Sequence, residues 1–161
     1  MIIHANLRAI NNFVVLKLVV YESLQLSGAA RNAERLGLYV AWLVSNNLLA
    51  ENTEISAGRA AAHLRMQALT GPEFLTTVLH GELRADHLNE LGRSFSESYF
   101  VSGTFNEDYA SCDYKGENEW HRYDDVVPKI SAAFRKFREP ESKLKQRMAK
   151  ILQFPFRKKT P

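Results

Sequence analysis

The sequence predicts a mostly α-helical protein that folds as a single compact bundle of about six helices. Apolar residues recur at helical spacing along most of the chain, and the segment from Leu36 to Val44 has no charged residue, which is typical of a helix at the centre of a bundle. The chain has 161 residues, 45% of them hydrophobic and 11% aromatic, which fits one domain with a sizeable core. We expect a helical domain over residues 1–139 and a basic C-terminal helix and tail over residues 140–161.

The first apolar segment, residues 13–21, is compatible with two structures. Its β-branched residues favour a strand, but no later segment is an obvious partner, so a strand and a core helix both stay open. Lys17 interrupts the run, which argues against a signal peptide. The run is also about half the ~20 residues that a membrane span needs.

Two helices are expected between residues 27 and 69. Ser27 is a suitable N-cap for the first, which ends near Asn46. Thr53 is a suitable N-cap for the second, which runs toward Leu69.

Two further helices follow. Thr70 and Glu73 have the spacing of a capping box, Pro72 falls in the first turn, and Gly81 is well placed to end this short helix. The next helix is predicted by apolar residues at positions i, i+3, i+7 and i+11, namely Leu88, Leu91, Phe95 and Tyr99.

Residues 104–125 differ from the rest of the chain because five aromatic residues stand there among seven acidic ones. We expect one short helix from Asn106 and then a loop. The helix after the loop is expected to use Asp124 or Asp125 as its N-cap, to hold Pro128 in its first turn and to bury apolar residues as far as Phe137.

Charge is divided between the body of the chain and its C-terminal end. Residues 1–128 contain 10 Lys and Arg against 16 Asp and Glu, a net charge of −6, whereas residues 129–161 contain 11 against 2, a net charge of +9. The overall charge of +3 therefore says little about partners. A last amphipathic helix, residues 141–152, is expected in the basic part.

Several segments resemble, in the same order, an uncharacterised family of small bacterial helical proteins. Residues 35–42 (RLGLYVAW) are similar to its His-Ile-Gly-x-x-x-x-Trp helix, residues 86–92 to its Glu-Asp-Leu-Asn-x-x-Gly segment, and residues 120–124 to its Trp-x-x-Tyr-Asp segment. The resemblance covers roughly residues 30–138 and implies a mostly helical fold, with no activity to carry over. Arg35 replaces the family's histidine, which puts in doubt any site there. The resemblance also implies an association with toxin–immunity gene neighbourhoods.

No catalytic or metal site is predicted. None of the five histidines has His-x-x-x-His spacing, and the single cysteine, Cys112, excludes an internal disulfide and favours a reducing compartment, the cytoplasm. Acidic neighbours should raise the pKa of its thiol, which argues against a nucleophile. A solvated turn explains the one cluster of candidate metal ligands, which is His80, Glu82, Asp86 and His87.

Two surfaces are candidates for binding. Aromatic side chains among carboxylates suit a basic protein partner, although the commoner explanation of such a segment is that the aromatics cover the core while the acids are solvated. The candidates there are Tyr114, Glu117, Glu119 and Trp120. The basic end could meet phosphates or an anionic surface, although a solvated helix face is the commoner explanation. The candidates there are Lys143, Arg147, Lys150, Arg157, Lys158 and Lys159.

We therefore expect a cytoplasmic protein-interaction module, most concretely a bacterial immunity protein that neutralises a cognate toxin by direct binding. The alternative is binding to nucleic acid or an anionic surface through residues 141–159. We expect no enzyme activity, no cofactor, no metal and no membrane span. Within the core, we expect Trp42 to be buried because it lies in the charge-free segment.

Overall fold

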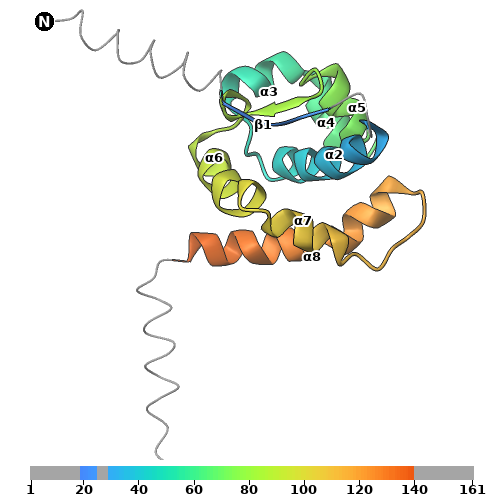
Figure 1. Cartoon of the computed structure of the whole chain (residues 1–161). Helices are drawn as coiled ribbons and strands as arrows, with labels where there is room; N and C mark the ends of the chain where they lie inside the picture. The colour runs from blue at the N-terminus through green and yellow to red at the C-terminus, as the bar shows by residue number, and fades with distance from the viewer. Residues whose placement is uncertain (1–18, 25–28, 140–161) are drawn as a thin grey trace, which may run out of the picture.

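The computed structural model describes residues 19–24 and 29–139 and is mostly helical (Figure 1). Seven α-helices and one two-stranded sheet make up this part of the chain, which confirms the predicted fold class. Two further turns are short, a 3₁₀ turn (η1) and a π turn (η2). The elements are β1 (Val20–Ser23), α2 (Ala29–Ser45), α3 (Glu51–Ala57), α4 (Arg59–Arg65), α5 (Gly71–Thr77), β2 (Glu82–Arg84), η1 (Ala85–His87), α6 (Glu90–Ser96), η2 (Glu97–Val101), α7 (Thr104–Ala110) and α8 (Glu119–Arg138).

Helix α2 lies in the middle of the molecule, with the small sheet on one side and α7 and α8 on the other (Figure 1). No side chain from Leu36 to Val44 is more than 5% exposed, as expected of a helix that is apolar on every face. Trp42 is completely buried, which confirms its prediction, and its indole N–H donates to Ser131 Oγ on α8 at 3.1 Å.

The start of α5 lies directly against α2, because glycine faces glycine where the two helices meet. A Cβ atom on Gly71 would fall 2.1 Å from the carbonyl oxygen of Gly37, so neither position has room for a side chain. The predicted capping box is present, since Glu73 N donates to Thr70 Oγ1 and Thr70 N donates to Glu73 Oε2. Local sequence therefore fixes the start of this helix against the core.

The prediction of a single helix from Thr53 to Leu69 is wrong in two respects. Helix α3 begins two residues before Thr53, which is buried inside it instead of capping it. Gly58 then has a positive φ of 52°, which favours glycine, and separates α3 from α4. Ala57 and Ala61 are both buried on the two sides of this break.

The spacing of four apolar residues located α6 and η2, and three of the four, Leu88, Phe95 and Tyr99, are buried as predicted. Leu91 is 37% exposed, whereas Gly92 packs so closely on Leu48 that a Cβ atom there would fall 2.6 Å from the Leu48 carbonyl oxygen. The π turn that follows changes the helical phase, so that Tyr99 and Phe100 are both buried.

Helix α8 begins earlier than predicted, and neither Asp124 nor Asp125 caps it. Its N-cap is Asn118, whose side-chain oxygen accepts from the N–H groups of the second and third residues that follow. Pro128 consequently lies inside the helix and not in its first turn. Phe137, predicted to be buried, is 39% exposed at the far end of the helix.

The end of the first apolar run forms β1, which pairs antiparallel with β2. Val20 lies opposite Arg84, Glu22 lies opposite Leu83, and the register shifts between the two pairs. The strand alternative therefore holds for residues 20–21, and β2 is the partner that the sequence did not make obvious. Residues 13–18 of the run, Ser27 and the whole of residues 140–161 lie outside the described residues.

Candidate protein-binding surface at the start of α8

The loop between α7 and α8, residues 111–118, lies at the edge of the molecule (Figure 1). We call it the acidic loop after the segment around it: residues 104–125 contain seven Asp and Glu against Lys115 and Arg122, a net charge of −5, and the loop itself contains two acids and the exposed Lys115. The side chains of Asp113 and Glu117 are exposed on it. It is therefore the part of the predicted surface that is open to a partner.

One carboxylate on α8 holds the beginning of the acidic loop. Oδ2 of Asp125 accepts from the Cys112 thiol at 2.9 Å and from the N–H groups of Asp113 and Tyr114 at 2.8 and 3.1 Å. These hydrogen bonds, that of the thiol first, lower the pKa of Asp125. Burial, together with the Asp125 carboxylate, raises the pKa of the Cys112 thiol, which therefore lacks the features of a nucleophile.

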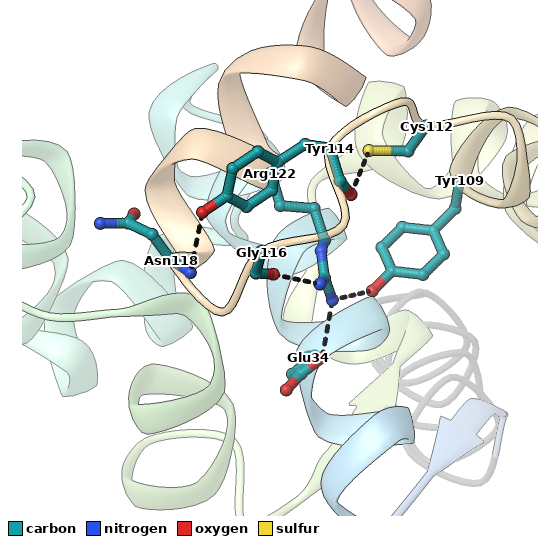
Figure 2. A network of polar contacts seen from close by, with 7 residues as sticks. All are labelled: Glu34, Tyr109, Cys112, Tyr114, Gly116, Asn118 and Arg122. Carbon is teal, nitrogen blue, oxygen red and sulfur yellow. Dashed lines mark hydrogen bonds and ion pairs between the residues drawn. The ribbon is translucent and has the colours of Figure 1, made fainter.

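Arg122 holds the end of the acidic loop and joins three parts of the fold (Figure 2). One terminal nitrogen donates to Glu34 Oε2 on α2 at 2.7 Å and to the Tyr109 hydroxyl on α7 at 3.1 Å. The other donates to the carbonyl oxygen of Gly116 in the loop at 2.7 Å. The planar guanidinium, which presents several donors in fixed directions, suits this position.

Tyr114 is folded over the loop that carries it. Its hydroxyl accepts from the N–H of Asn118 at 3.2 Å (Figure 2), and its ring meets His121 edge-on at 5.6 Å. A Cβ atom on Gly116 would fall 2.3 Å from the same hydroxyl, so the ring fits only because this residue is glycine. Tyr114 thus shapes the loop and is only half-exposed.

The other predicted contact residues separate in the structure. Glu117 is exposed on the loop, whereas Glu119 and Trp120 lie in the first turn of α8 and face a pocket between α2, α5 and α8. Trp120 is partly buried, packs on the core and meets Tyr123 edge-on at 5.2 Å. The predicted set is therefore two adjacent features, an exposed loop and a pocket beside it.

The pocket, which we call the Glu119 pocket, is partly open and has a volume of about 20 Å³, room for about one water molecule. Oε2 of Glu119 is buried there without a hydrogen-bond partner. Burial raises the pKa of Glu119, the Glu34 and Glu73 carboxylates add to this effect, and the Thr70 hydroxyl and Arg122 oppose it. Most of the walls are apolar and come from Leu38, Ala41, Pro72, Trp120 and Tyr123.

A second pocket, of about 250 Å³, brings together three of the four residues considered as metal ligands, His80, Asp86 and His87. Asp86 is engaged by Arg84 at 2.9 Å, and His87 Nδ1 accepts from the Arg84 N–H. Burial is the largest cause that lowers the pKa of His87, to about 4. Within the described residues, no group of three His, Cys, Asp or Glu could hold a metal ion.

Arg35, which stands where the resembling family has histidine, connects α2 to its neighbours. It pairs with Glu22 on β1, donates to Asn106 Oδ1 on α7 at 2.7 Å and lies 5.7 Å from the centre of the Phe100 ring. Its contacts therefore join the sheet, α2 and α7. The six basic candidates of residues 141–159 lie outside the described residues, so binding to polyanions stays a prediction.

Arg122 and Asp125 are the residues that sequence analysis missed as organisers of this surface. The only sign in the sequence is that Arg122 is one of two cations among the seven acids of residues 104–125. Its partner Glu34 stands 88 positions earlier in the chain, so no local pattern connects them.

No helix in the part of the chain that the structure describes has the length and apolar character to cross a membrane. Comparisons with curated proteins and with solved structures find no significant match. A family model described as "Domain of unknown function (DUF7832)" matches residues 22–123, from β1 to the first turns of α8. This match spans more than half of the chain and includes the acidic loop and the Glu119 pocket. The chain therefore belongs to this uncharacterised domain family.

Proposed function

We propose that this protein binds a basic protein partner through the acidic loop. The observation that carries the proposal is the anchoring of the loop, because Asp125 fixes its beginning and Arg122 fixes its end while Asp113 and Glu117 stay exposed. A loop held in one conformation loses little entropy on binding, and exposed carboxylates speed the approach of a positive surface.

The concrete form of the proposal is a bacterial immunity protein that neutralises a toxin by direct binding. The resemblance to small bacterial proteins, which implies an association with toxin–immunity gene neighbourhoods, favours it. A lone cysteine that is buried and held by Asp125 is compatible with a reducing cytoplasm, where the proposal places the protein.

Co-expression with the product of the neighbouring gene tests the proposal. The loop variant Asp113→Lys/Glu117→Lys should associate at least about tenfold more slowly with that protein and protect cells less. The reason is that a positively charged loop would repel a basic partner during its approach. The matched control is Glu51→Lys/Glu90→Lys, which makes the same change of charge at exposed positions on α3 and α6. These helices lie far from the loop (Figure 1).

Three outcomes are distinguishable. Slower association of the loop variant alone, with circular dichroism and melting temperature retained, supports the proposal. A folded loop variant that associates and protects like the unchanged protein rules out this surface. Equal slowing of both variants indicates an effect of overall charge and also contradicts a specific role for the loop.

A further inference from the structure

The Glu119 pocket lies beside the acidic loop and contains a carboxylate oxygen, Oε2 of Glu119, that is buried without a hydrogen-bond partner, while the Thr70 hydroxyl and Arg122 interact with the carboxylate as a whole. Of the three carboxylates that gather here, Glu34 pairs with Arg122 at 2.7 Å, and Glu73 closes the capping box with Thr70. Oε2 of Glu119 is buried with no hydrogen-bond partner. Burying a carboxylate oxygen without a partner is costly, and natural proteins keep such a group mainly where it serves function.

The volume of the pocket limits the size of any cation that could pair with Glu119. Its volume of about 20 Å³ has room for about one water molecule, and an ammonium group is similar in size. A planar guanidinium is larger, whereas a lysine presents a compact charge at the end of a flexible stem. The apolar walls, including Pro72, Trp120 and Tyr123, suit the methylene groups of that stem.

We propose that the Glu119 pocket receives the ammonium group of a lysine side chain from the basic partner. This inference rests on the proposed function and deepens it, since the exposed loop would attract the partner and the pocket would hold one of its residues. Glu119 supplies the carboxylate oxygen, and the neighbouring Glu34 and Glu73 add negative potential. Arg122, also at the pocket, opposes the cation but is already paired with Glu34.

Titration of the protein with two capped amino acids tests the inference without the natural partner. The probes are Nα-acetyl-lysine N-methylamide and the corresponding norleucine derivative, which has a similar stem without the charge. In ¹H–¹⁵N spectra at low salt and constant ionic strength, the lysine probe should shift the Trp120 indole N–H and the backbone of the first turn of α8. The norleucine probe should bind at least about tenfold more weakly, because it cannot pair with a carboxylate.

Two matched variants assign the effect to one carboxylate. Glu119→Gln keeps the shape of the side chain and should weaken the lysine probe about tenfold or more, whereas Glu117→Gln, an exposed acid two positions earlier, should change it by less than about twofold. The comparison of the two probes uses the unchanged protein, so it holds even if a variant fails to fold.

Three results would overturn the inference: no shifts with the lysine probe, equal shifts with both probes, or unchanged lysine binding in folded Glu119→Gln. Any of them would indicate that the pocket holds only water. The proposed function would still stand if the Asp113→Lys/Glu117→Lys variant slowed association with the partner. Conversely, lysine binding at Glu119 with no effect of the loop variant would separate the pocket from that function.

Discussion

Replacing Arg122 with methionine should loosen the acidic loop and destabilise the fold by about 2 kcal/mol. Methionine keeps much of the apolar stem but removes the bonds to Glu34, Tyr109 and Gly116. A hydrogen bond to a charged group contributes about 1.5–3 kcal/mol when well buried and less when exposed. The Arg122 and Glu34 side chains are 22% and 43% exposed, so the ion pair itself contributes less than about 1 kcal/mol.

Urea unfolding followed by circular dichroism measures this change, and hydrogen exchange of the acidic-loop amides measures the local loosening. Arg59 is exposed at the start of α4, so Arg59→Met is the matched control and should change the free energy of unfolding by less than about 0.5 kcal/mol. Arg122→Lys should recover only part of the loss, because an ammonium cannot reach three acceptors in different directions with one planar group. A loss for Arg122→Met no greater than that of Arg59→Met would refute the role of Arg122 as the anchor of the loop.

Three further predictions concern stability. Trp42→Ala should lower the free energy of unfolding by about 3–5 kcal/mol in urea titration, since the ring is completely buried. Gly71→Ala should lower it by at least about 2 kcal/mol, measured in the same way, because the new methyl group would meet the Gly37 backbone. The pKa of His87 falls from 6.5 to about 4 on folding, so between these values the unfolded chain binds a proton that the folded chain does not. Stability should therefore fall by about 2–3 kcal/mol from pH 7 to pH 4, and His87→Gln should remove this part of the pH dependence.

The core was predictable because its signals are local. The charge-free run of residues 36–44 identifies the central helix by composition alone, and Thr70 with Glu73 marks a helix start within four positions. The glycine contact between α2 and α5 was not predictable. Nothing in the local sequence shows that Gly37 and Gly71 meet.

The sheet was missed because pairing is a property of two distant segments. Strand β2 has only three residues, two of them charged, and this is too short a run for alternation of polar and apolar residues to identify a strand. Leu83 is completely buried, but a single apolar residue between Glu82 and Arg84 is no evidence for a strand. The pairing places it opposite Glu22.

The sequence located the candidate surface but misassigned the roles of its residues, because two helix starts competed. Asn118 and Asp125 are both good N-caps, and local preference cannot choose between them. Tertiary structure determines which residue caps α8. Asp125 accepts hydrogen bonds from three donors in the loop, whereas Asn118 lies where α8 can begin beside α2 and α5.

The early start of α8 also determines which acids can take part in binding. Had the helix begun at Asp125, Glu119 and Trp120 would belong to the same exposed loop as Glu117, and one charged surface would result. Because α8 begins at Glu119, its first turn carries that carboxylate into the pocket, and Glu117 stays outside. Exposed and buried carboxylates affect different steps, since long-range attraction governs association and a desolvated pair governs dissociation. The proposed surface should therefore separate into two kinetic functions, with Glu117→Lys slowing association and Glu119→Gln hastening dissociation of the same complex.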